Sequence, residues 1–221
     1  PRISSVLMHR YYSRDYHCIY CNGLSESGNL SSENGTYIGL SALLHKNWKV
    51  SAYVDIFSFP WLKYRVDAPS VGRETLLQLE YQPSRSVLMY FRYKNKSNHK
   101  NYDNEILDEV IPKIKQDFRY NIEYSVFKTL ILKNRIELKY YKPKNESAQF
   151  STLFYQDIIF TSDNIPFRFA LRYAIFDTDS YESRIYAYEN DVLYSYSVPP
   201  FNDEGYRYYI LIKASLFRQL D

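Results

Sequence analysis

The fold of this chain is decided by a pattern that is clearest in residues 118–126, which read Phe118-Arg119-Tyr120-Asn121-Ile122-Glu123-Tyr124-Ser125-Val126. Apolar or aromatic side chains alternate there with polar ones at every second residue. Successive side chains of a β-strand point to opposite faces of its sheet. A period of two therefore predicts a strand with one apolar face and one polar face.

The same alternation recurs between residues 36 and 214 and predicts about nine to eleven antiparallel strands. Residues 183–198 fit either one long strand or a tight hairpin around Glu189-Asn190-Asp191. The clearest strand windows are 48–56, 75–82, 87–94, 118–126, 130–140, 152–160, 167–175 and 206–213, with 36–44 as a weaker one.

The predicted connections alternate in length, which is typical of outer-membrane barrels with short turns on one rim and long loops on the other. Within the loop 95–117, residues 104–111 are a candidate helical turn that ends before Pro112. Short connections are predicted at 45–47, 83–85, 127–128 and 161–165, and long ones at 57–73, 95–117 and 141–149.

The start of the chain is predicted to differ from the rest. Residues 13–23 are expected to form a short helix with Ser13 as its N-cap and Asp15 near its positive end. Residues 1–221 as a whole are expected to be a single β-barrel region. We read both ends as cuts inside a longer protein, because no export signal opens the chain.

Composition narrows the class of protein. The chain has 25 Tyr and 13 Phe but only 6 Gly, and tyrosine suits a membrane–water interface because one end of its ring is apolar and the other polar. No apolar stretch approaches the roughly 18 residues of a membrane helix, which excludes a helical membrane protein.

The net charge of +3 is too small to indicate nucleic-acid binding by itself. Cys18 and Cys21 are better explained as incidental thiols or a local disulfide than as a redox motif.

Two features of the apolar faces favour a transmembrane barrel over a soluble antiparallel sandwich. The faces carry Tyr81, Tyr93, Tyr140 and Tyr173 at or near strand ends, as in an aromatic girdle. In the windows above they contain no Asp, Glu, Lys or Arg. We therefore expect an all-β antiparallel meander that forms part of a barrel in the outer membrane of a Gram-negative bacterium.

The polar faces are then expected to line the barrel lumen, and their charges are net basic. One hypothesis is an anion-favouring pore or a seat for an acidic partner. The favoured alternative is that the charges pair across strands and only stiffen the interior. The predicted lumen-facing bases are Lys49, Arg92, Lys94, Arg119, Lys133, Arg135, Lys139, Arg168, Arg172, Arg207 and Lys213, and the acids are Asp55, Glu80, Glu123, Glu137 and Asp157.

Catalytic motifs are scarce, so the protein is expected to be neither an enzyme nor dependent on a cofactor. The histidines His9, His17, His45 and His99 show no metal-ligand spacing. Oxygen ligands for calcium could come from Asp177, Asp179 and Glu182. A solvated loop is the favoured reading of these three, because they lack the glycine and spacing of a calcium-binding loop.

Three further stretches carry a family resemblance: 9–16, 59–69 and 172–181, the last containing Phe176-Asp177-Thr178-Asp179-Ser180-Tyr181. With these the chain resembles the C-terminal, barrel-like region of Bacteroidetes helix-hairpin-helix domain-containing proteins. The resemblance implies a link to DNA handling only through a helix-hairpin-helix segment that this chain lacks, so no DNA-binding residue is carried over.

Two functions remain from different classes. The first is a non-enzymatic outer-membrane barrel with a transport or envelope-scaffold role, whose partners are membrane lipid and envelope proteins. The alternative is a soluble all-β domain that binds nucleic acid or glycan through a face rich in Tyr and Arg.

Overall fold

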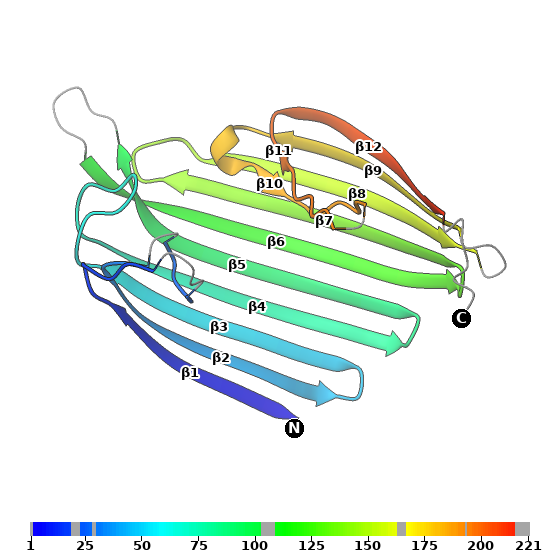
Figure 1. Cartoon of the computed structure of the whole chain (residues 1–221), viewed down its shortest axis with the longest axis horizontal. Helices are drawn as coiled ribbons and strands as arrows, with labels where there is room; N and C mark the ends of the chain where they lie inside the picture. Colours follow the sequence, from blue (N-terminus) through cyan, green and yellow to red (C-terminus); the bar gives the residue numbers. More distant parts are fainter. Residues whose placement is uncertain are drawn as a thin grey trace. The chain divides into compact units, whose positions relative to one another are not determined.

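The computed structural model describes residues 2–18, 23–27, 30–102, 109–162, 167–192 and 194–214. These residues are almost entirely β-structure, so the predicted all-β antiparallel meander is confirmed. Ten strands form one sheet in the order β1-β2-β3-β4-β5-β6-β7-β8-β9-β12 (Figure 1). Among the described residues, no helix has the length and apolar character needed to cross a bilayer.

The strands of the main sheet are long, and nearly all follow one another as hairpins. A short 3-10 helix, η1 (Tyr181–Ser183), and a two-stranded ribbon lie between β9 and β12. The strands are β1 (Ile3–Tyr12), β2 (Glu33–His45), β3 (Trp48–Phe59), β4 (Ser70–Ser84), β5 (Val87–Tyr102), β6 (Glu109–Phe127), β7 (Leu130–Pro143), β8 (Gln149–Thr161), β9 (Phe167–Thr178), β10 (Ile185–Tyr186), β11 (Pro200–Phe201) and β12 (Glu204–Ala214).

Strand β1 was not predicted from the sequence. Its residues do not alternate, because Ser4 and Ser5 stand side by side between apolar neighbours. Pairing with β2 nevertheless holds the whole segment extended, in a register that sets Met8 opposite Tyr37 and Arg10 opposite Gly35. A partner strand can impose β-structure where local patterning does not.

The predicted helix at 13–23 is wrong for the residues that can be described. Residues 14 and 15 form a turn, 13 and 16–18 have no regular structure, and 19–22 lie outside the described part. The Ser13 carbonyl accepts hydrogen bonds from the Tyr16 amide (3.2 Å) and the Ser32 amide (3.1 Å). The second bond joins the two ends of the β1–β2 connection, and a single turn does not provide the length that a helix needs.

Cys18 is disulfide-bonded.

The loop predicted at 95–117 is also shorter than expected, since β5 runs to Tyr102 and β6 starts at Glu109. Of the candidate helical turn at 104–111, residues 109–111 are strand and the others lie outside the described residues. Residues 95–101 are all polar, so no apolar period marks this end of β5. Its place between β4 and β6 in the sheet extends the strand to Tyr102.

Residues 183–198 form an antiparallel hairpin rather than one long strand. Strand β10 pairs with β11, and an isolated bridge joins Glu189 to Ser197. We call residues 181–203 the inner hairpin; it is wider than the tight turn at 189–191 that the sequence suggested.

The chain divides into two compact units. Unit 1 comprises 1–79, 92–117 and 141–148, and unit 2 comprises 80–91, 118–140 and 149–221. In each unit the buried side chains lie on the face of the sheet that carries the polar residues, which we call the covered face. Examples are Asp55 and Phe57 in unit 1 and Asp157 in unit 2, all below 8% exposed.

The other face, which we call the open face, carries large apolar side chains that are exposed in both units. In unit 1, β2 and β3 present Ile38 (56% exposed) and Ile56 (58%). In unit 2, β12 presents Ile210 and Ile212, each 60% exposed. The sheet therefore has its polar positions covered and its apolar positions uncovered, the reverse of a soluble sandwich.

Close packing on the covered face of unit 1 depends on Gly72 in β4. A Cβ at this position would lie 2.2 Å from the ring of Phe57 and 3.0 Å from the Ser97 carbonyl oxygen. We expect Gly72→Ala to lower the free energy of unfolding by about 1–3 kcal/mol, because the buried ring must shift. Chemical denaturation measures this free energy.

The control is Gly205→Ala. A Cβ at Gly205 would lie 3.3 Å from the ring of Phe176, so this substitution should change stability by less than about 0.5 kcal/mol. Equal losses in the two variants would contradict the role assigned to close packing at Gly72.

Candidate functional site

The covered face of unit 1 contains a buried ion triad that joins the first three strands. The Arg10 guanidinium of β1 donates to Glu33 of β2 (2.6 Å) and to Asp55 of β3 (2.9 Å). All three residues are below 8% exposed. Glu33 also accepts from the Ser25 hydroxyl (2.6 Å) and the Glu26 amide (3.1 Å). The β1–β2 connection is therefore tied to the sheet through the same carboxylate.

A second cluster in unit 1 surrounds Glu74 of β4. Its carboxylate accepts from Lys94 (2.8 Å) and Lys96 (3.0 Å) of β5 and from the Tyr53 hydroxyl of β3. Lys96 also forms an ion pair with Glu26. Because Glu26 belongs to the β1–β2 connection, this connection lies against the covered face as far as β5.

The covered face of unit 2 centres on Arg172 of β9, which is 2% exposed. Its guanidinium meets the carboxylate of Asp157 on β8 through two nitrogens, one of them at 2.6 Å. It also donates to the Tyr188 carbonyl of the inner hairpin and lies 3.8 Å from the centre of the Tyr155 ring. Such a bidentate, stacked arrangement is specific to arginine.

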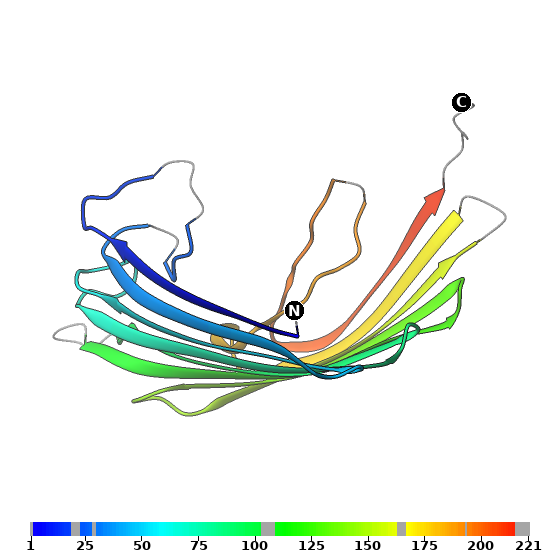
Figure 2. The ribbon, with the colours of Figure 1, turned by 90° about the horizontal axis from the view of Figure 1, so that it is seen from below.

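The inner hairpin projects from one face of the sheet (Figure 2) and is held there by an apolar cluster and by polar contacts. Ile185, Ala187 and Phe201 pack with Leu153, Tyr155 and Ala174 and are at most 1% exposed. Arg207 of β12 pairs with Glu189 at 3.0 Å, and the Asn190 amide donates to the Tyr209 hydroxyl at 3.0 Å. The hairpin is thus a packed part of unit 2.

The predicted basic residues differ in the partners that they have within the described part of the chain. Five of them form ion pairs: Lys94 with Glu74, Arg119 with Glu137, Lys133 with Glu123, Arg172 with Asp157 and Arg207 with Glu189. Of the others, Arg92 donates to Gln78, Lys139 donates to the Arg184 carbonyl, Arg135 lies over the Tyr155 ring, Lys49 is half-buried, and Arg168 and Lys213 line a cavity.

Sequence reasoning missed six charged residues of these clusters: Arg10, Glu26, Glu33, Glu74, Lys96 and Glu189. Arg10, Glu26 and Glu33 lie outside every predicted strand window, and Lys96 falls in the predicted loop 95–117. Glu189 lies in the stretch 183–198, for which a long strand and a tight hairpin were both open. Glu74 stands just before the window 75–82, in the same parity as its polar positions, so a longer window would have found it.

The weak calcium hypothesis is not supported by the side chains. Within the described residues, no group of three or more His, Cys, Asp or Glu is arranged to hold a metal ion. Asp177 lies within β9, whereas the Asp179 carboxylate accepts from the Phe150 amide at 2.7 Å. Asp179 thus has a structural role at the start of β8.

We expect the attachment of the inner hairpin to depend on pH through Glu189. Burial raises the pKa of its carboxyl, and the Arg207 charge lowers it by less. The folded state therefore binds this proton more tightly than the unfolded state, so hairpin attachment is strongest at low pH and weakens as pH rises from the ordinary value of 4.5 through the folded pKa. The Glu189 amide donates to the Ser197 carbonyl. We expect this amide to lose protection against hydrogen exchange as the pH rises through the folded pKa of Glu189.

The control for this prediction is Glu189→Gln, which should remove the pH dependence while leaving a polar group in place. An exchange profile that keeps the same dependence in the variant would assign it to another group.

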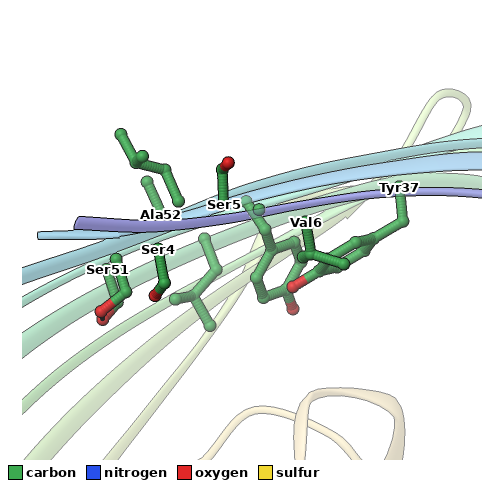
Figure 3. Close-up of a pocket in the computed structure, with 11 residues that line it drawn as sticks. Ser4, Ser5, Val6, Tyr37, Ser51 and Ala52 are labelled. Carbon is green, nitrogen blue, oxygen red and sulfur yellow. Dashed lines mark hydrogen bonds between the residues drawn. The ribbon is translucent and has the colours of Figure 1, made fainter. Parts of the chain in front are cut away.

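Unit 1 has a hollow of about 290 Å³ beside its first three strands. Its lining includes Ser4, Ser5, Ser51 and Ala52. Figure 3 shows Ser4 and Ser51 on one side of the ribbon and Ser5 on the other, so the lining belongs to both faces of the sheet. It holds no charged side chain and offers no chemistry for recognising a ligand.

No protein-family model matches this sequence, and a search of curated proteins finds no match to it.

Proposed function

We propose that this chain is part of a non-enzymatic β-barrel protein of the outer membrane of a Gram-negative bacterium, with a transport or envelope-scaffold role. The observation that carries the proposal is the open face. In both units the exposed side of the sheet is the apolar one, with Ile38 and Ile210 as examples in the middle of their strands. Contact with lipid is the environment in which such a face is stable.

The covered face fits the interior of a barrel. Lipid cannot satisfy charged side chains, so ion-paired residues such as Arg10 and Arg172 belong on the side away from it. Lipid also cannot pair free backbone groups, so the outermost strands need backbone partners and the sheet must be completed into a closed barrel.

The segments that lie against the covered face narrow the choice of role for the proposed barrel. In unit 1 the β1–β2 connection, and in unit 2 the inner hairpin, lie against the covered face and neutralise its charges through Glu26 and Glu189. An interior occupied in this way favours a scaffold or a gated, selective passage over a wide water-filled pore. Handling of DNA stays an analogy with the resembled family, and no residue described above supports it.

The alternative function, a soluble binding domain for nucleic acid or glycan, predicts that the open face is covered by protein. A second layer would have to cover it in water, because contiguous apolar patches of this kind are rare on soluble monomers.

Cell fractionation of the full-length protein in its native host tests the proposal, with heated and unheated samples compared by electrophoresis. We expect recovery in the outer membrane and a band that shifts on heating, as a closed barrel resists detergent until it is boiled. Recovery in the soluble fraction without a shift would overturn the proposal in favour of the alternative.

A further inference from the structure

Unit 2 contains a cavity of about 180 Å³ between the inner hairpin and the last two strands of the main sheet. Arg168 of β9 and Lys213 of β12 lie on one side of it, and Tyr188, Asn190 and Asp191 of the hairpin on the other. Two apolar side chains of the same strands complete the lining. Every one of these residues belongs to unit 2.

The strand register places two positive charges side by side at this cavity. Arg168 is directly opposite Lys213 in the β9–β12 pair. Side chains in such positions point to the same face, with Cβ atoms roughly 4.5–5.5 Å apart, and like charges there are unfavourable. On its other side Arg168 faces Thr161 of β8, so neither neighbouring strand supplies a carboxylate.

Two other arginines of the same face have carboxylate partners. Four residues further along β9, Arg172 lies opposite Asp157 and forms an ion pair with it. Arg207 of β12 forms an ion pair with Glu189 of the inner hairpin. Within the described part of the chain, no side chain forms an ion pair or a hydrogen bond with Arg168 or Lys213.

Asp191 does not cancel this positive charge. Its carboxylate accepts hydrogen bonds from the Ser195 hydroxyl (2.8 Å) and the Val192 amide (2.7 Å). These bonds, with a smaller contribution from Lys213, lower the pKa of Asp191 and keep it ionised. With two positive charges and one negative charge, the cavity keeps a net charge of +1.

We propose that this cavity is a binding site for an oxyanion, the phosphate or carboxylate group of a small solute, held between the Arg168 guanidinium and the Lys213 ammonium. Arginine offers a planar pair of N–H donors to such a group, and lysine adds a compact charge beside it. The volume admits one such group with part of the molecule that carries it. The site goes beyond the proposed function and does not depend on it, because it lies within one unit whether or not that unit is in a membrane.

Calorimetric titration of the full chain at pH 7.5 and low salt tests the site, with inorganic phosphate and citrate as the two probes. The chain is kept dispersed in a nonionic detergent. We expect saturable binding of at least one probe, and the stronger of the two identifies the ligand as phosphate- or carboxylate-bearing. Arg168→Gln combined with Lys213→Gln should weaken binding at least about tenfold, since each charged hydrogen bond is lost.

The matched control is Lys46→Gln combined with Lys128→Gln, which makes the same change in net charge at two exposed turn residues. It should bind like the wild type. An equal loss in both double variants, or no saturable binding of either probe to the wild type, would overturn the proposal.

A second variant covers the case in which the double substitution prevents folding. Asp191→Asn removes the negative charge from the cavity and should tighten binding several-fold, whereas Glu204→Gln, an exposed acid at the start of β12, should not. Unchanged or weaker binding in Asp191→Asn would overturn the proposal as well.

Discussion

Ile210→Arg is expected to destabilise the protein in lipid by about 2–4 kcal/mol, the cost of a basic side chain on the lipid face near the middle of a membrane strand. Ile210 lies near the middle of β12 and is 60% exposed. In water, a substitution at such an exposed site would change stability by no more than about 0.5 kcal/mol. The measurement is denaturant unfolding of the chain refolded into phospholipid vesicles.

The control is Val126→Arg, because Val126 shares the apolar face of β6 and is 42% exposed but lies near the end of β6, close to the β6–β7 turn. A turn at the membrane surface can place the new charge in water, so the loss should be small. Ile38→Arg repeats the experiment in unit 1. Equally small effects at Ile210, Ile38 and Val126 would mean that the open face does not contact lipid, and the proposed location would fail.

Arg172→Met is expected to cost about 3–5 kcal/mol of unfolding free energy, because it leaves the Asp157 carboxylate buried without a counter-charge. Both residues are 2% exposed. The substitution also removes the donor to the Tyr188 carbonyl, so the inner hairpin should become more sensitive to protease. Chemical denaturation gives the first effect and limited proteolysis the second.

Two variants separate the unpaired charge from general disruption. Arg172→Met combined with Asp157→Leu should recover most of the lost stability, because a buried ion pair can be replaced by apolar groups at little cost. Lys133→Met should cost less than about 1 kcal/mol, since Lys133 and Glu123 are a third exposed and their pair is solvated. A double variant as unstable as Arg172→Met alone would refute the role assigned to the buried charge.

The strands of the middle of the chain could be predicted because their local pattern and their final environment agree. Residues 118–126 alternate without a break, and they lie within β6. The patterning also placed Arg119, Glu123, Lys133 and Glu137 on the polar face, but it did not specify which of them form ion pairs. Strand β1 and the turn at 14–15 were missed, since contacts with β2 and Ser32 decide them.

The sequence by itself determined the β-period, the division into one apolar and one polar face, and the all-β antiparallel class, because side-chain alternation is a local property of the chain. Only the tertiary structure decided which segments cover the polar face, that the inner hairpin packs on it, and which charges are paired. Register sets Asp157 opposite Arg172 but Lys213 opposite Arg168, and these partners lie far apart in sequence. Pairing of that kind depends on how strands align in space, which no local pattern specifies.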